Sequence, residues 1–249
     1  MAIYAIADLH LAFGVPNKSM EAFGPAWAHY AEKIETHWRE TVRDDDLVLV
    51  AGDISWGMAL EEAKKDLDWI GALPGTKIMI RGNHDYWWNS LAKLQKILPP
   101  KMHLIQNNAL TWNGIAIGGA RLWDTPEYGF SEVIEYRENP RKNKEKAVPS
   151  PDETEKIFVR ELLRLEASLS QLDKTASKKI AMTHYPPIGK ELHASRASEI
   201  LEKHKVDLCV FGHLHNVRKD ALPFGKKSGV DYHLTSADYL EFKPLKLLD

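Results

Sequence analysis

The sequence predicts an α/β fold, and three observations lead to that class. Short apolar runs such as 47–51 and 77–81 have the length of buried strands; Gly75 and Gly82 bound the second run, and Gly52 follows the first. Helical periodicity fills the stretches between the early runs, and this alternation favours parallel strands joined by right-handed crossovers. Asn113-Gly114 separates two further apolar runs and predicts a β-hairpin, so the sheet is expected to be mixed.

The individual elements follow from the same patterns. The chain opens with an expected strand at 3–7, and further strands are expected at 47–51, 77–81, 103–106, 109–112, 115–117, 180–183, 207–211, 232–235 and within 240–247. Apolar residues at three- and four-residue spacing predict helices at 25–42, 60–73, 89–98, 152–172 and 195–203. Asn89 is the expected N-cap of the third helix, and Pro99-Pro100 ends it.

A single domain spanning residues 1–249 accounts for this pattern. The segment 121–175 differs from the rest because it is charged and poor in strands. We interpret it as a helical, cap-like insertion near the mouth of the site. Its basic residues Arg141, Lys142 and Lys144 are either a contact for a phosphorylated substrate or part of a solvated loop.

Composition narrows the function classes. The formal net charge is -2, so no overall field draws the chain to nucleic acid or to an acidic membrane. Cys209 is the one cysteine, which excludes an internal disulfide framework. The sequence shows no signal peptide and no apolar stretch long enough to span a bilayer. A cytoplasmic protein is therefore expected, with an oligomeric state that the sequence leaves open.

Side chains of the metal-ligand type follow five of the expected strands. They are Asp8 with His10, then Asp53, then Asn83 with His84, then His184, and finally His213 with His215. Each residue alone is more often a structural part of a turn. Because the carboxyl ends of parallel strands meet at one edge of a sheet, five such strand ends together predict a shared site.

The donor types in this set indicate the metal. Carboxylate oxygen, amide oxygen and imidazole nitrogen suit Mn, Fe, Zn, Co or Ni, and the absence of thiolate argues against a structural zinc site. Seven candidate ligands exceed what one tetrahedral ion takes. With one bridging carboxylate they suit two divalent ions, for which Mn is the first expectation and Mg remains an option.

The run Asp8-x-His10, Gly52-Asp53, Gly82-Asn83-His84-Asp85, His184 and Gly212-His213-x-His215 resembles the calcineurin-like metallophosphoesterase family. All of that family's motif positions are filled in order between residues 8 and 215. The match is specific because five separated motifs must agree at once. The resemblance implies a four-layer α/β/β/α sandwich with two mixed sheets and a dinuclear metal site.

The resemblance also implies a role for each residue. One ion would be held by Asp8, His10, Asp53 and His215, and the other by Asp53, Asn83, His184 and His213, with Asp53 bridging. His84 would face the phosphate as an acid or stabiliser near the leaving group, and Asp85 is a candidate partner that orients it. Hydrolysis would proceed by attack of a hydroxide that bridges the two ions, whose charge lowers the pKa of water toward ~7.

The expected function is therefore hydrolysis of a phosphomonoester or phosphodiester on a small phosphorylated molecule. Alternatives are a nucleotide or lipid-linked pyrophosphate hydrolase, a protein phosphatase, and a non-enzymatic scaffold on the same fold. Arg81 and Arg121 either contact phosphate or occupy ordinary strand-edge positions. Aromatic residues beside the motifs either stack on a substrate or pack under the loops; these are Trp56, Tyr86, Trp87, Trp88 and Tyr185.

Overall fold

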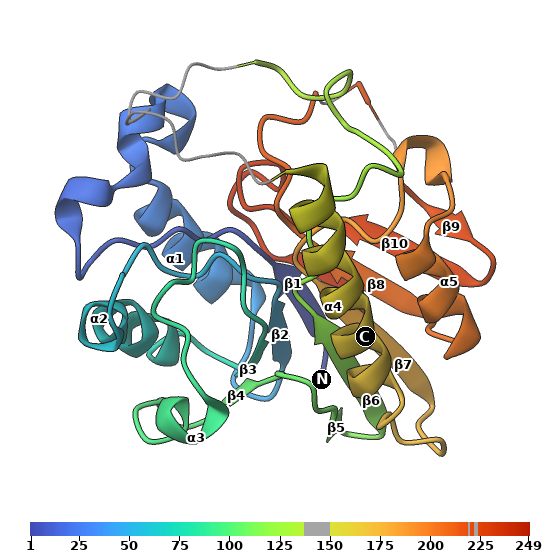
Figure 1. The fold of residues 1–249 in the computed structure, drawn as a ribbon. Coiled ribbons are helices and arrows are strands. Elements are labelled where there is room, and N and C mark those ends of the chain that lie inside the picture. The colour runs from blue at the N-terminus through green and yellow to red at the C-terminus, as the bar shows by residue number, and fades with distance from the viewer. Residues whose placement is uncertain (137–149, 219, 222–223) are drawn as a thin grey trace.

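The computed structural model describes residues 1–136, 150–218, 220–221 and 224–249 (Figure 1). Two β-sheets pack face to face in it, with helices on both outer faces. The predicted α/β class with two mixed sheets is confirmed. Within the described part of the chain, no helix is long and apolar enough to cross a bilayer.

The first sheet has the strand order β11-β1-β2-β3-β4. Its strands are β1 (Ile3–Ile6), β2 (Leu47–Val50), β3 (Thr76–Met79), β4 (Met102–Leu104) and β11 (Leu245–Leu248). The first four run parallel, and β11 is antiparallel to β1. The strand expected late in the sequence therefore joins this sheet, beside the first strand of the chain.

The second sheet has the order β5-β6-β7-β8-β10-β9. Its strands are β5 (Leu110–Trp112), β6 (Ile115–Ala120), β7 (Lys178–Thr183), β8 (Leu208–Phe211), β9 (Lys226–Lys227) and β10 (Val230–Leu234). Strands β6, β7, β8 and β10 are parallel. Strands β5 and β6 form the antiparallel hairpin predicted from Asn113-Gly114.

Three apolar clusters define the layers. Alternate residues of both sheets, for example Ala5 and Leu49 facing Ile180 and Val210, form a core between the sheets. Helices α1 (Tyr30–Thr41), α2 (Leu60–Gly71) and α3 (Leu91–Leu94) cover the outer face of the first sheet. Helices α4 (Pro151–Leu169) and α5 (Arg196–Lys203) cover the outer face of the second.

Two helices are shorter than the sequence pattern predicts. The expected helix at 25–42 is divided into a 3₁₀ turn, Pro25–Trp27, and helix α1, because His29 between them has a left-handed backbone with φ of 54°. The expected helix at 89–98 is reduced to α3. Ser90 occupies its N-cap position, while the Asn89 side chain accepts a hydrogen bond from the Ser90 N–H.

In its described residues, 121–136 and 150–175, the segment 121–175 contributes a loop and the core helix α4. Helix α4 buries Phe158, Leu162, Leu165 and Leu169 in the cluster that it shares with the second sheet. The cap-like role expected for 121–175 stays a prediction. The basic residues Arg141, Lys142 and Lys144 lie outside the described residues.

Candidate metal centre

The strand-end residues meet where the carboxyl ends of both sheets adjoin. Asp8 and His10 follow β1, Asp53 follows β2, and Asn83 follows β3, all in the first sheet. The second sheet contributes His184 after β7, and His213 and His215 after β8.

The loops after β1 and β2 run side by side and hold this arrangement. The N–H of Asp8 donates to Gly52 O at 2.9 Å, and the N–H of His10 donates to Asp53 O at 2.9 Å. Asp8, His10 and Asp53 all have positive φ, between 45° and 57°. Non-glycine residues adopt this region at a cost, and such strain gathers at functional sites because the surroundings impose it.

The first group of donor atoms comprises His10, His215 and Asp8. Nε2 of His10 lies 3.1 Å from Nε2 of His215. Oδ1 of Asp8 lies 4.0 Å from the former nitrogen and 3.8 Å from the latter. These three side chains could hold one cation from three sides.

The second group comprises Asn83, His184 and His213. Oδ1 of Asn83 lies 2.7 Å from Nε2 of His184 and 3.1 Å from Nδ1 of His213. An amide oxygen and two imidazole nitrogens thus converge on one point, which is a second place for a cation.

Asp53 lies between the two groups. Its Oδ2 is 3.7 Å from Nε2 of His10 and 3.5 Å from Nε2 of His184. Its Oδ1 accepts a hydrogen bond of 2.8 Å from the His84 backbone N–H. One carboxylate therefore faces a donor of each group, which is the position of a bridging ligand.

The protonation chemistry of the site fits bound cations. Two imidazole nitrogens 3.1 Å apart cannot both carry protons, and Oδ1 of Asp8 is buried with no hydrogen-bond partner among the described residues. Burial lowers the pKa of His10 and His213 well below the usual value, so both rings are neutral, as ligands must be.

The other two histidines show how much negative charge the site holds. Burial alone would lower the pKa of His184. The nearby Asp53 carboxylate favours the charged imidazolium and raises the pKa of His184 to about 9. At His215, Asp238 likewise outweighs burial and raises the pKa to about 9. Burial of Asp53 would raise the pKa of this carboxyl group, but His184 holds it well below the usual value. Cations supply the same positive charge once these protons leave.

The family model for calcineurin-like phosphoesterases matches residues 1–217. The chain belongs to the calcineurin-like phosphoesterase family. No curated protein matches it.

Solved structures of the family's fold resemble the chain over nearly its whole length. Phosphopantetheinyl hydrolase from Mycobacterium tuberculosis aligns with a TM-score of 0.56 at 15% identity, over 99% of this chain and 95% of that one. TT1561 of Thermus thermophilus aligns with a TM-score of 0.50 at 13% identity, over 99% and 97%. At such identities the likeness concerns the fold alone.

Hydrogen bonds behind the calcineurin-like centre orient its histidines. Nδ1 of His184 lies 3.0 Å from Ala51 O, and Nδ1 of His215 lies 2.9 Å from Oδ1 of Asp238. Each acceptor keeps a proton on Nδ1, so the lone pair of the neutral ring is on Nε2, which faces the donor group. Sequence reasoning missed Asp238, although it follows β10 as the other acids follow their strands.

Aromatic rings enclose the centre. Trp56 stacks on His10 with centroids 4.9 Å apart, and Tyr185 lies 3.9 Å from His213. Trp27, which lies within the helix expected at 25–42, packs edge-on against His10 and His215. These ring contacts restrict the orientation of the imidazole planes.

Asp85 is buried and accepts hydrogen bonds from four N–H groups. These come from the backbone of Ile54, Ser55 and Gly82 and from Nε1 of Trp87. The carboxylate thus ties the loop after β2 to the loop after β3. The expected role of Asp85 in orienting His84 stays a prediction. The ring of His84 itself lies between Trp56, 4.5 Å away, and Tyr86, 6.2 Å away.

A pocket of about 230 Å³ opens beside His213. Tyr185, Trp123, Tyr128 and Phe130 give it an aromatic wall, and Asp124 is the acidic side chain in its lining. The loop 123–134, part of the segment predicted as an insertion, therefore borders the candidate metal centre.

Proposed function

We propose that this protein is a dinuclear-metal-dependent phosphohydrolase that cleaves a phosphomonoester or phosphodiester of a small molecule. The observation that carries the proposal is the position of Asp53 between two groups of donor atoms. Its Oδ2 is within 3.7 Å of a donor in each group. Carboxylates occupy such a place in two-metal sites, where the ions act together on one phosphate.

The distances among the donor atoms support the proposed ligand assignment. Asp8, His10 and His215 would hold one cation, Asn83, His184 and His213 the other, and Asp53 both. Mn is the proposed metal, since oxygen and imidazole donors suit it. When bound, two divalent cations lower the pKa of water and offset the negative charge of a phosphate.

His84 is the proposed proton or hydrogen-bond donor to the leaving group. Its backbone N–H is fixed by Asp53, and its ring lies between Trp56 and Tyr86. The aromatic pocket beside His213 is the proposed place for the organic part of the substrate. The cytoplasm is the proposed location, in keeping with the single, buried and unpaired Cys209.

Metal content and hydrolysis, measured together, test this function. Wild-type protein loaded with Mn should hold close to two ions per chain and hydrolyse mono-aryl or bis-aryl phosphates. Asp53→Asn should lose at least one ion and most of the activity, because it removes the shared ligand. The rate ratio of diester to monoester then gives the substrate class.

Asp68→Asn is the matched control. Asp68 lies on α2, half-exposed and paired with Lys64, and makes no contact with the donor groups. This variant should keep metal and activity. Equal and negligible rates in wild type and both variants, with little bound metal, would instead favour the scaffold alternative.

A further inference from the structure

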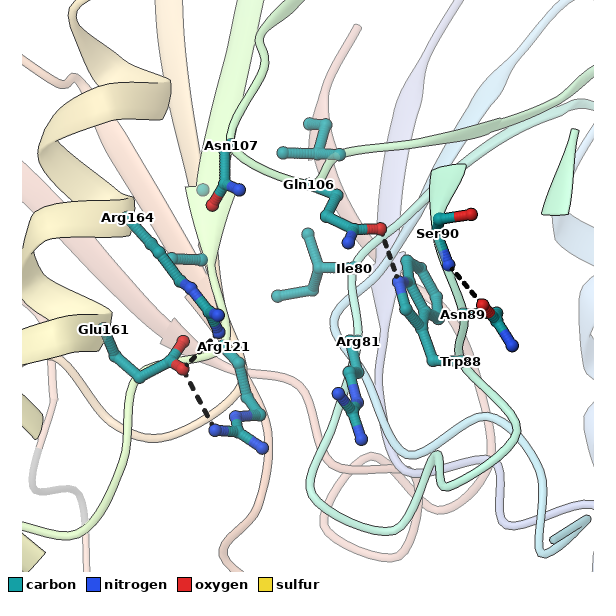
Figure 2. Close-up of a pocket in the computed structure, with 13 residues that line it drawn as sticks. Ile80, Arg81, Trp88, Asn89, Ser90, Gln106, Asn107, Arg121, Glu161 and Arg164 are labelled. Atoms are coloured by element: carbon teal, nitrogen blue, oxygen red, sulfur yellow. Dashed lines mark hydrogen bonds and ion pairs between the residues drawn. The ribbon is translucent and has the colours of Figure 1, made fainter. Parts of the chain in front are cut away.

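A second cavity lies between the two sheets, separate from the aromatic pocket. It has a volume of about 370 Å³ and is lined from one side by Ile80 and Arg81 after β3, and from the other by Ala120 and Arg121 at the end of β6. Figure 2 shows the two arginine side chains coming from opposite walls. We call this cavity the arginine pocket.

The lining of the arginine pocket is strongly cationic. Arg81, Arg121 and Arg164 line it together with the single carboxylate of Glu161. Glu161 Oε1 receives Arg121 Nη2 at 3.0 Å and Arg164 Nη1 at 2.7 Å, as the dashed lines in Figure 2 indicate. One buried carboxylate is therefore shared by two guanidinium groups, and the lining keeps a positive excess.

Arg81 has no acceptor within the described part of the chain. No hydrogen bond or ion pair joins its guanidinium to another described residue, and its Nε is buried without a partner. Nε of Arg121 is likewise buried and unpartnered. Besides Glu161, the Asp85 carboxylate acts electrostatically on Arg81, but Asp85 already accepts hydrogen bonds from four N–H groups. Buried donors of this kind normally have an acceptor.

The character of the pocket indicates which acceptor would fit. Guanidinium groups present paired N–H donors that match the oxygens of a phosphate. The polar side chains of Asn89, Ser90 and Asn107 complete the rim. The Trp88 Nε1–H donates to Gln106 Oε1 at 3.0 Å, which fixes a further part of the wall.

The arginine pocket adjoins the candidate metal centre along the chain. Arg81 lies two residues before Asn83. The carbonyl of Arg121 accepts hydrogen bonds from the N–H groups of His184 at 3.1 Å and Tyr185 at 2.9 Å. Both walls therefore belong to segments that also position donor atoms of the centre.

We propose that the arginine pocket binds a phosphate-class anion, with Arg81 as its principal ligand and Arg121 and Arg164 as supporting cations. The anion is either a second phosphate group of the substrate or free inorganic phosphate. The chemistry of recognition is the same for both. Binding here does not depend on hydrolysis at the metal centre, so this proposal and the proposed function can fail separately.

Nuclear magnetic resonance of the arginine Nε–H groups tests the site directly. Inorganic phosphate is titrated into the full-length, ¹⁵N-labelled protein loaded with Zn, which is diamagnetic. The Nε–H signals of Arg81 and Arg121, assigned by their loss in Arg81→Gln and Arg121→Gln, should shift and saturate. In Arg81→Gln the remaining Arg121 signal should saturate at about tenfold higher phosphate or more, as expected for loss of one charged partner.

Two further variants separate binding from folding. Arg164 is partly exposed, so Arg164→Gln should fold normally while weakening phosphate binding several-fold. Arg160→Gln is the matched control, because Arg160 is exposed on the same helix and does not line the pocket. Unshifted Arg81 and Arg121 signals, or equal phosphate affinity in wild type, Arg81→Gln and Arg164→Gln, would overturn the proposal.

Kinetics then distinguish the two sources of the anion. An aryl phosphate is compared with the same ester carrying a second phosphate group. A preference in kcat/KM for the second compound that falls toward one in Arg81→Gln identifies the anion as part of the substrate. No preference, with weaker inhibition by phosphate in Arg81→Gln, identifies free phosphate. Absence of all hydrolysis refutes the proposed function and leaves the resonance result standing.

Discussion

His215 shows how a residue outside the family's motifs controls one inside them. Its Nδ1 faces Oδ1 of Asp238 at 2.9 Å, and Oδ2 of the same carboxylate accepts the Asn216 N–H at 2.8 Å. Asp238 thereby fixes both the ring and the backbone that follows it. Partners of this kind orient a ligand and raise its basicity.

Asp238→Asn should therefore weaken metal binding about 10-fold to 100-fold. An amide can offer one oxygen but not two, so either His215 or Asn216 loses its acceptor. The measurement is metal affinity by competition with a chelator. Asp231→Asn is the control, since Asp231 pairs with His233 at 3.3 Å on β10, away from the donor groups. Equal affinities in all three proteins would exclude a positioning role for Asp238.

Lys77 is a buried cation that forms no ion pair with a carboxylate of the described residues. It lies on β3, its Nζ donates to Leu73 O, and 1% of its surface is exposed. Burial, with a further contribution from Lys101, lowers its pKa from 10.5 to about 8. The folded protein therefore releases this proton at a lower pH than the unfolded chain does.

The sign of the resulting pH dependence is fixed. Between pH 8 and 10.5 the unfolded state binds more protons at Lys77, so its contribution to the free energy of unfolding increases as pH rises. The free energy of unfolding of wild type, relative to that of Lys77→Met, should therefore increase by about 1–2 kcal/mol across this pH range. Urea unfolding at about pH 7.5 and about pH 10 measures it. Lys178→Met, at the exposed start of β7, should show no such difference from wild type.

At the scale of elements, the strand ends approach so closely that only glycine fits at Gly52. Its φ is +94°, and a Cβ there would lie 2.6 Å from Nδ1 of His184 and 2.9 Å from Cα of Gly82. The ends of β2, β3 and β7 thus meet with no side chain between them. This contact places Asp53 and His184 next to each other.

Gly52→Ala should destabilise the fold by about 2–4 kcal/mol and reduce metal binding, because backbone strain and overpacking add. Gly229→Ala isolates the effect of backbone strain. Gly229 has a φ of +90°, and a Cβ added there would have no atom within 4 Å, so strain alone acts at that position. Urea unfolding of both variants gives the comparison. Equal losses would mean that the close approach at Gly52 has no cost of its own.

The elements themselves were largely predictable because their apolar patterns are regular. The hairpin at Asn113-Gly114 and the strands of both sheets follow local signals and are confirmed, except for the two-residue strand β9, which was not predicted from the sequence. The break before α1 was not predictable, since apolar residues continue at helical spacing through it while His29 turns left-handed. The shortness of α3 was also missed.

At the scale of the whole molecule, the candidate centre joins the two sheets. Asp8, His10, Asp53 and Asn83 belong to the first sheet's loops, and the three other proposed ligands to the second sheet's. The sequence alone could show that each of these residues follows a strand. The partners behind them, such as Asp238 and Trp27, depend on how the two sheets meet, which no local pattern encodes.

Metal should therefore stabilise the fold as a whole. A ligand at about 100 times its Kd adds about 2.7 kcal/mol, which corresponds to a rise in Tm of roughly 5–10 °C for a chain of this size. Mn should raise the Tm of wild type and Asp68→Asn alike, and a chelator should reverse the rise. In Asp53→Asn, Mn should raise the Tm by less than half as much as in wild type. The same rise in Asp53→Asn would show that Mn stabilises the protein elsewhere.

The pairing of β11 with β1 has a consequence for biosynthesis. Ile3 is matched with Leu248 and Ala5 with Leu245, so neighbours in the sheet are separated by almost the entire chain. While the polypeptide is being translated, one edge of β1 has no partner and its hydrogen-bonding groups remain open to other strands. The first sheet is completed only when residues 245–248 have been made. Until then the nascent chain can misassemble through β1, the first strand to be made.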